Sequence, residues 1–239
     1  MKIKLFTIPN CITLINLLCG VGSIISSLVY NDLQMAFIFI VASAIADFLD
    51  GFSARLLKQY SDIGVQLDSL ADMVSFGVAP AIAMTVICKG MPSAFGLEGV
   101  WRDVICYTPL VVAALSALRL AKFNIDTTQK EEFEGLPTPG SAILLTSLAA
   151  LLQIDELKVD VEWLALISVL VAAMLISPIR MFSFKFHEWG LGNNDNKLRY
   201  GFLIVSCLLI CTLRLYAIPA IIVIYIVVSA IRWIVKKRE

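Results

Sequence analysis

Eight long runs without an Asp, Glu, Lys or Arg constrain the fold of this chain more than any other feature. They cover residues 12–30, 33–46, 73–88, 104–118, 136–154, 163–179, 200–213 and 215–231. A helix needs about 20 mainly apolar residues to cross a bilayer, so the shorter runs must extend into polar flanks. With 59% hydrophobic and 16% charged residues, the composition excludes a disordered chain and disfavours a soluble domain. We therefore expect an all-α integral membrane protein, a bundle of about eight transmembrane helices in a single domain over residues 1–239.

Charge is balanced in total but uneven in position. Lys and Arg number 19, as do Asp and Glu, so no basic excess indicates a nucleic-acid partner. If the runs cross the membrane alternately, 15 of the 19 Lys and Arg residues fall on one side. Because short cytoplasmic loops are enriched in these residues, we expect an inner (cytoplasmic) membrane protein with both termini in the cytoplasm. The run 12–30 is too long for the apolar part of a cleavable signal peptide.

Four aspartates lie at the facing ends of the second and third runs. Asp47 and Asp50 extend the second run, and Asp68 and Asp72 precede the third. Positions three or four apart share one face of an α-helix, so each pair points in one direction. If the two helices pair antiparallel, the four carboxylates converge at the cytoplasmic boundary of the membrane. We expect a polar active site there that faces the cytoplasm.

Such a cluster requires compensating cations, because ionised carboxylates repel one another and resist desolvation. Oxygen ligands suit Mg²⁺ or Mn²⁺, and two such ions could clamp a pyrophosphate. Gly51 and Ala54 are small enough to let a bulky substrate lie against the helix, and Arg55 could contact phosphate oxygens. Helix capping or helix packing would explain any one of these residues, but it explains the regularly spaced set poorly.

The spaced set resembles the signature of CDP-alcohol phosphotransferases. The pattern D-x2-D-G-x2-A-R-x8-G-x3-D-x3-D is matched without exception by Asp47, Asp50, Gly51, Ala54, Arg55, Gly64, Asp68 and Asp72. Enzymes of that family move a phosphatidyl-type group from a CDP-linked lipid to an alcohol and release CMP. The resemblance implies that the core signature of the domain is 47–72 and that the activity depends on divalent metal.

The resemblance also implies a role for each matched residue. Asp47, Asp50 and Asp68 would hold the metals, while Asp72 would be a metal ligand and the general base for the acceptor hydroxyl. The other matched residues would contact the cytidine and its phosphates, namely Gly51, Ala54, Arg55 and Gly64. Asn10 and Thr13 share a helical stripe with Asn16, where they could face the nucleotide, although capping and interhelical hydrogen bonds also explain them.

Three further strings, 8–20, 117–124 and 133–139, are similar to the phosphatidylserine synthase branch of the family. The branch implies CDP-diacylglycerol and L-serine as substrates, with phosphatidylserine and CMP as products. Arg119 could bind the serine carboxylate, or it could be an ordinary cytoplasmic anchor.

Glycerol 3-phosphate and inositol phosphate stay open as acceptors. An intramembrane prenyltransferase is less consistent with the interposed Gly-x-x-Ala-Arg. A cation transporter is less consistent with four Asp on one side of the membrane.

The C-terminal part of the chain has no motif that we can assign. It contributes the apolar helices expected within 163–235. The segment 180–199 alternates aromatic and polar residues at its start, which is typical of a chain at the headgroup level. The family resemblance also implies a homodimer among the expected assemblies, although no residue of the sequence establishes it.

Overall fold

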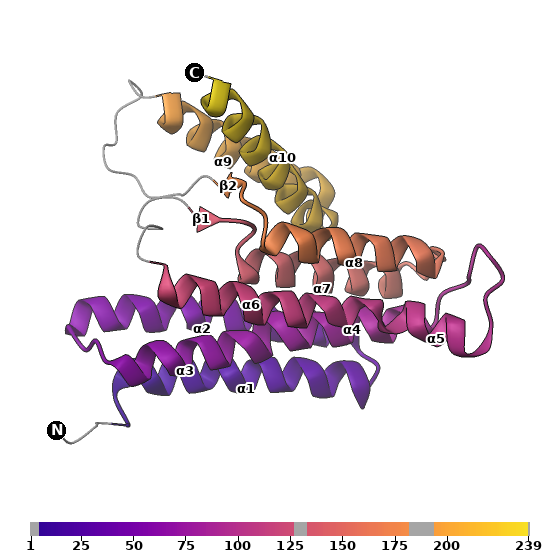
Figure 1. Cartoon of the computed structure of the whole chain (residues 1–239), viewed down its shortest axis with the longest axis horizontal. Helices are drawn as coiled ribbons and strands as arrows, with labels where there is room; N and C mark the ends of the chain where they lie inside the picture. The colour runs from indigo at the N-terminus through magenta and orange to yellow at the C-terminus, as the bar shows by residue number, and fades with distance from the viewer. Residues whose placement is uncertain (1–4, 127–132, 182–193, 239) are drawn as a thin grey trace.

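The computed structural model describes residues 5–126, 133–181 and 194–238, and the regular structure in them is almost entirely helical (Figure 1). The main body contains α1 (Ile8–Leu28), α2 (Leu33–Leu57), α3 (Asp62–Asp72), α4 (Ala79–Lys89), α5 (Gly99–Tyr107), α6 (Val111–Ile125), α7 (Thr138–Ile154) and α8 (Val161–Leu175). The π-helix η1 (Met73–Val78) joins α3 to α4, and the 3-10 helix η2 (Thr108–Leu110) joins α5 to α6. The C-terminal part contains α9 (Asn194–Leu213), η3 (Arg214–Tyr216) and α10 (Ala217–Arg238). Two short strands, β1 (Phe133–Glu134) and β2 (Arg180–Met181), pair antiparallel.

Five helical segments among the described residues are long and apolar enough to cross a membrane. They are Ile8–Leu28, Leu33–Leu57, Asp62–Lys89, Gly99–Ile125 and Leu198–Val235. α7 and α8 are apolar but shorter. The expectation of a helical integral membrane protein is confirmed, and each of the eight apolar runs is largely helical. That eight segments cross the membrane stays a prediction.

α1 has its polar side inside and its apolar side outside. Its buried residues are mostly small or polar: Pro9, Asn10, Thr13, Asn16, Gly20, Ser23, Ser26 and Ser27. Its large apolar side chains face outwards, and Leu18 is 67% exposed. In lipid, apolar side chains gain little by moving inside, so helices pack through small residues and interhelical hydrogen bonds. This pattern explains why α1 can lie within the bundle while its surface stays apolar.

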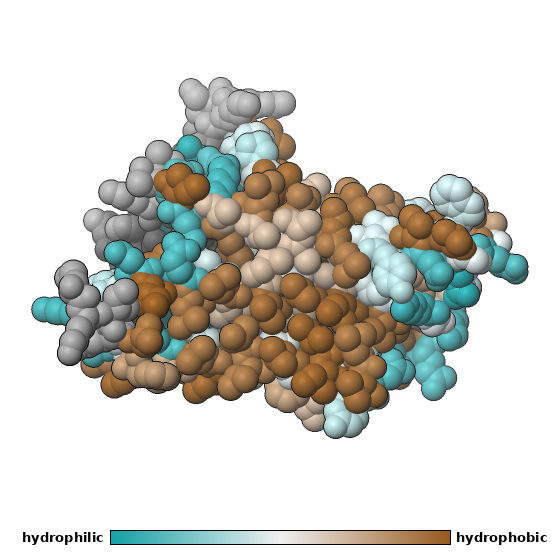
Figure 2. Space-filling view, turned by 60° about the horizontal axis from the view of Figure 1, so that its bottom comes forward, coloured by the Kyte–Doolittle hydropathy of each residue, from teal (hydrophilic) through white to brown (hydrophobic). Residues whose placement is uncertain are grey.

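The outer surface agrees with this interpretation. Figure 2 shows a broad apolar surface over the body of the bundle, with hydrophilic residues gathered towards its two ends. Large exposed side chains such as Phe48 and Leu70 contribute to the apolar surface. A contiguous exposed apolar surface of this extent is typical of a protein that contacts lipid.

α1 is the element that holds the site together, because it packs against α2, α3, η1 and α4. α2 ends and α3 begins at the same end of the bundle, where α1 also starts and α6 also ends (Figure 1). We call this the carboxylate end, since the four aspartates of α2 and α3 lie towards it. The connections α1–α2 and α4–α5 lie at the opposite end (Figure 1).

α9 and α10 form a hairpin beside the main body (Figure 1), and the chain reverses at Arg214, whose φ is 51°. α10 contacts α7 and β2. In the most apolar 18-residue stretch of Leu198–Val235, only 6% of the residues are buried, so most of this hairpin faces outwards. Most of the segment 180–199 falls in 182–193, outside the described residues.

Gly20 lies where α1 crosses η1, and a Cβ on it would lie 2.7 Å from Ser75 Cα. We expect Gly20→Ala to lower the free energy of unfolding by about 1–3 kcal/mol, because backbone must move to admit the methyl group. Denaturant unfolding in detergent would measure it. Gly201→Ala in α9 is the matched control, since no atom lies within 4 Å of its Cβ position. Equal effects of the two substitutions would contradict the close crossing.

Candidate functional site

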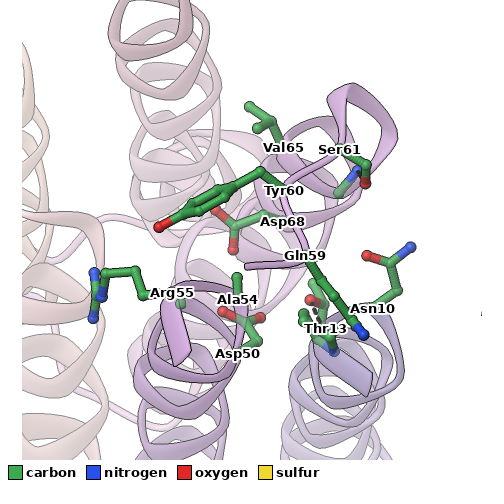
Figure 3. A pocket seen from close by; sticks show the side chains of 13 residues that line it. Asn10, Thr13, Asp50, Ala54, Arg55, Gln59, Tyr60, Ser61, Val65 and Asp68 are labelled. Carbon is green, nitrogen blue, oxygen red and sulfur yellow. Dashed lines mark hydrogen bonds between the residues drawn. The ribbon is translucent and has the colours of Figure 1, made fainter. Parts of the chain in front are cut away.

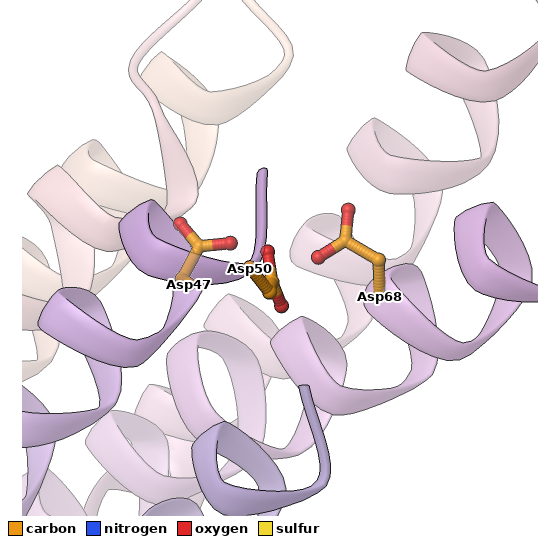
Figure 4. A group of neighbouring side chains, drawn as sticks. All are labelled: Asp47, Asp50 and Asp68. Carbon is orange, nitrogen blue, oxygen red and sulfur yellow. The ribbon is translucent and has the colours of Figure 1, made fainter. Parts of the chain in front are cut away.

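Three carboxylates from two helices face one another at the carboxylate end (Figure 4). Asp47 and Asp50 share a face of α2, as their spacing predicted, and Asp68 approaches from α3. One oxygen of each lies within 4.8 Å of one oxygen of each of the others. α1 packs against both α2 and α3, so it positions the two helices that carry the carboxylates.

The oxygen atoms of this group fit a divalent cation. Asp50 is 6% exposed, and its Oδ2 has no hydrogen-bond partner among the described residues. Oδ1 of Asp68 is likewise buried and unpartnered. Buried carboxylate oxygens without a partner are costly unless a cation or a donor satisfies them. A set of three carboxylates suits Mg²⁺ or Mn²⁺, and the residues that would hold such an ion are Asp47, Asp50 and Asp68.

Asp72 does not belong to the set of three whose oxygens all lie within 4.8 Å of one another. It is 8% exposed, one turn beyond Asp68, and its Oδ1 accepts a hydrogen bond from Nδ2 of Asn16 over 3.0 Å. The structure brings three of the four carboxylates within 4.8 Å of one another, and the convergence of Asp72 with them stays a prediction. A metal-ligand role for Asp72 stays a prediction. Of the roles considered for Asn16, the structure confirms the interhelical hydrogen bond, which here joins α1 to α3.

A sharp turn brings Asp50 and Asp68 together. α2 ends at Lys58, whose left-handed conformation (φ 51°) lets its N–H bond back to the helix. α3 begins after Ser61, whose hydroxyl accepts from the N–H of Gly64 over 3.1 Å. A side-chain oxygen that satisfies a free N–H is the usual way to start a helix. The π-helix η1 follows Asp72 directly, and such segments recur at functional sites.

A cavity of about 330 Å³ adjoins the carboxylates (Figure 3). Its lining includes Asp50, Asp68 and all six residues predicted to bind the CDP-lipid: Asn10, Thr13, Gly51, Ala54, Arg55 and Gly64. Figure 3 shows these side chains coming from α1, α2 and α3 around one hollow. The sequence prediction missed the other lining residues, which are Pro9, Gln59, Tyr60, Ser61 and Val65. Several of these belong to the α2–α3 turn, which the signature spans but does not specify.

Gly51 and Gly64 of the signature have different surroundings, so the lack of a side chain has a different meaning at each position. A Cβ on Gly64 would lie 3.2 Å from Oδ1 of Asn10 and 3.1 Å from Oγ of Ser61, so close packing within the protein requires glycine there. A Cβ on Gly51 would meet no atom within 4 Å. Protein packing therefore does not explain Gly51, and the open space beside it is available to a ligand.

Arg119 lies on α6, near the carboxylate end, and is 9% exposed. Its Nη1 donates to the hydroxyl of Thr138 over 3.3 Å, while its Nε has no partner among the described residues. It lies close enough to Asp72 for their charges to interact. Arg119 also lines a second cavity of about 350 Å³, together with Leu118, Lys122, Phe123, Glu134, Leu175, Ile176 and Ser177.

The geometry at the carboxylate end agrees with comparison to known proteins. The family model described as CDP-alcohol phosphatidyltransferase matches residues 6–175. The chain belongs to this family. The matched residues include the three-carboxylate group, Asp72, the first cavity and Arg119, so the resemblance of the signature is confirmed at the level of the family. The C-terminal hairpin lies beyond the match.

Curated relatives within the family carry one name, CDP-diacylglycerol--serine O-phosphatidyltransferase. The Bacillus subtilis protein is 37% identical over 59% of this chain and 75% of its own length. The Helicobacter pylori protein is 34% identical over 96% of this chain and 92% of its own length, which includes the C-terminal hairpin. The Methanocaldococcus jannaschii protein is 30% identical over 74% of each chain. Because the chain belongs to this family, the two alternatives from other families, a prenyltransferase and a cation transporter, are excluded.

Gly51 offers a direct test of the first cavity. We expect Gly51→Leu to leave thermal stability in detergent unchanged, because no protein atom opposes the new side chain. Affinity for CDP should fall at least about tenfold, since the side chain fills space beside the carboxylates. Isothermal titration of CDP would measure it, with Gly201→Leu as the control. Wild-type CDP affinity in a folded Gly51→Leu protein would show that the nucleotide binds elsewhere.

Proposed function

We propose that this protein transfers the phosphatidyl group of CDP-diacylglycerol to the hydroxyl of L-serine, which gives phosphatidylserine and CMP. The observation that carries the proposal is the junction of the first cavity with the three-carboxylate group. All six candidate CDP-lipid residues line that cavity, and Asp50 and Asp68 belong to both. The shared name of the relatives supports serine as the acceptor.

The donor binds with its cytidine and phosphates in the first cavity. Arg55 is exposed at the end of α2, where its guanidinium supplies charge-assisted hydrogen bonds to phosphate oxygens. Gly51 leaves the helix backbone open to the ligand, and Asn10 and Thr13 supply polar groups from α1. The acyl chains lie outside, against the apolar surface of the bundle.

Asp47, Asp50 and Asp68 hold the divalent metal, with two ions as the expected number. When bound, Mg²⁺ or Mn²⁺ neutralises the pyrophosphate and stabilises the charge that develops on the leaving CMP. By holding the ion in one place, the three carboxylates would also orient the donor, which is how positioning lowers a barrier. Asp72 is a further candidate ligand from the same face of α3.

Asp72 takes the proton of the acceptor. The serine oxygen forms a bond to the phosphorus of the phosphatidyl group while the bond from that phosphorus to the bridging oxygen breaks. CMP leaves with the bridging oxygen, and the serine proton passes to the Asp72 carboxylate. Asp72 is buried at the end of α3 and bonded to Asn16, where its carboxylate serves as the general base.

The second cavity supports serine rather than a phosphorylated acceptor. Lys122 and Glu134 pair over 2.8 Å, which leaves Arg119 as the buried cation of the lining. One such guanidinium suits a carboxylate, whereas a phosphomonoester dianion calls for more uncompensated positive charge. The Glu134 carboxylate has a second oxygen, which can accept from the α-ammonium group of serine while the first stays paired with Lys122. One buried guanidinium and one carboxylate in the same lining therefore favour a zwitterion over glycerol 3-phosphate or inositol phosphate.

The membrane arrangement of the proposal keeps the carboxylate end and both termini in the cytoplasm. It is supported by the excess of Lys and Arg in the loops assigned to that side. The segment Leu198–Val235 counts as two spans if the chain reverses at η3, so that α9 and α10 each cross. With the other four long segments and with α7 and α8, the total is eight. A homodimer is the assembly to test, by cross-linking in membranes.

CMP release by the purified protein with CDP-diacylglycerol and Mn²⁺ or Mg²⁺ tests the proposed reaction. We expect release with L-serine, far less with glycerol 3-phosphate or inositol phosphate, and none after chelation of the metal. Asp68→Asn should lower the rate at least about a hundredfold, because it removes a metal ligand.

Asp62→Asn is the matched control for this assay, since Asp62 begins the same helix but lies outside the three-carboxylate group. It should retain activity. Release with a phosphorylated acceptor alone would move the protein to another branch, and metal-independent release would contradict the site.

Arg119→Gln and Glu134→Gln test the second cavity. Each should raise the KM for serine by about tenfold or more, because a hydrogen bond to a charged group is lost. The KM for CDP-diacylglycerol should stay within about twofold of the wild-type value. Arg102→Gln is the control, since Arg102 binds the carbonyl oxygens of Lys89 and Met91. An unchanged serine KM in the folded variants would exclude this cavity as the acceptor site.

A further inference from the structure

Asn16 is a fully buried amide in α1 with 0% exposure. Its side chain bonds across the bundle rather than along its own helix. Nδ2 donates to Oδ1 of Asp72, and the hydroxyl of Ser43 on α2 donates to Oδ1 of Asn16. One side chain thus connects α1, α2 and the last residue of α3.

Two buried hydroxyls of α1 behave differently from the Asn16 amide. Thr13 donates to the carbonyl oxygen of Pro9, and Ser27 donates to that of Ser23. Both bonds run one turn back along the same helix, which is the local way to satisfy a buried hydroxyl. The Asn16 side chain is distinguished by its partner, a carboxylate 56 positions away in the sequence.

The orientation of this amide follows from its partners. A carboxylate accepts hydrogen bonds only, so the NH₂ group of Asn16 must face Asp72. The amide oxygen then faces Ser43, whose hydroxyl can donate. If the amide turned over, its oxygen would oppose the carboxylate and a buried donor would be lost. Ser43 therefore keeps the NH₂ group directed at Asp72.

We propose that Asn16, held by Ser43, is a positioning residue that fixes the Asp72 carboxylate for proton transfer. Asn16 occupies Oδ1, which leaves Oδ2 to receive the proton of the acceptor hydroxyl. Within the described part of the chain, the hydrogen-bond donor that the structure identifies for the Asp72 carboxylate is Asn16. A base so held needs no reorientation when the acceptor arrives, which is how preorganised groups speed a reaction. The inference rests on the function proposed above.

Ser43 and Ser75 form a matched pair for the test. Both bond to the main-chain carbonyl of Asn16, Ser43 over 3.2 Å and Ser75 over 3.0 Å, and the Ser75 bond does not involve the amide side chain. The hydroxyl of Ser43 meets the side-chain oxygen. Removal of either hydroxyl disturbs the packing of α1, whereas only removal of the Ser43 hydroxyl frees the amide.

The experiment compares Asn16→Leu, Ser43→Ala and Ser75→Ala with the wild type. It measures kcat, the KM for each substrate, the Kd of CDP and the melting temperature in detergent. We expect kcat to fall at least about a hundredfold in Asn16→Leu and about tenfold in Ser43→Ala. The Kd of CDP and the KM for CDP-diacylglycerol should stay within about twofold of wild type. Ser75→Ala should keep its kcat within about twofold of the wild-type value, whatever its melting temperature.

Two results would overturn the proposal. One is a folded Asn16→Leu protein with wild-type kcat. The other is an equal loss of kcat in Ser43→Ala and Ser75→Ala that follows the loss of melting temperature, as a purely structural role requires. The serine pair decides the question even if Asn16→Leu does not fold. Wild-type protein without serine-dependent CMP release contradicts the proposed function instead, so the two failures are distinguishable.

Discussion

The structure depends on three like charges brought together at one end of a membrane bundle. One oxygen of each of Asp47, Asp50 and Asp68 lies within 4.8 Å of one oxygen of each of the others, and two of their buried oxygens have no partner among the described residues. Repulsion and desolvation oppose such a group, so it is stable as an ionised cluster only with cations. A divalent metal held by these carboxylates would resolve this conflict.

The packing of α1 around this cluster is small and polar, whereas the large apolar core lies mainly among α4, α7 and α8. α1 presents a stripe of small and polar residues to its neighbours, and its Gly20 allows the backbone of η1 to approach closely. The same stripe supplies Asn10 and Thr13 to the first cavity and Asn16 to Asp72. Packing and function therefore share one face of one helix, which lipid permits because apolar residues can stay outside.

Much of the site could be predicted from local spacing. Residues three and four apart share a helix face, so the signature was enough to orient Asp47 with Asp50 and to place Gly51 beside them. Spacing could not show that Asp72 accepts a hydrogen bond from Asn16, because that depends on how α1 packs against α3. It also could not show that Glu134 joins Arg119 at one cavity, since β1 follows a connection whose path the sequence pattern does not define. Helical runs were predictable from hydropathy, whereas the number that cross the membrane depends on tilt and length.

The central claim is that the three-carboxylate group holds metal against a nucleotide in the first cavity. Anomalous diffraction from crystals of the protein grown with Mn²⁺ and CDP tests it most directly. The account predicts manganese peaks among Asp47, Asp50 and Asp68, with the CDP phosphates beside them and the cytidine in the first cavity. CDP bound in that cavity without manganese at these carboxylates, or manganese bound only elsewhere, would contradict it.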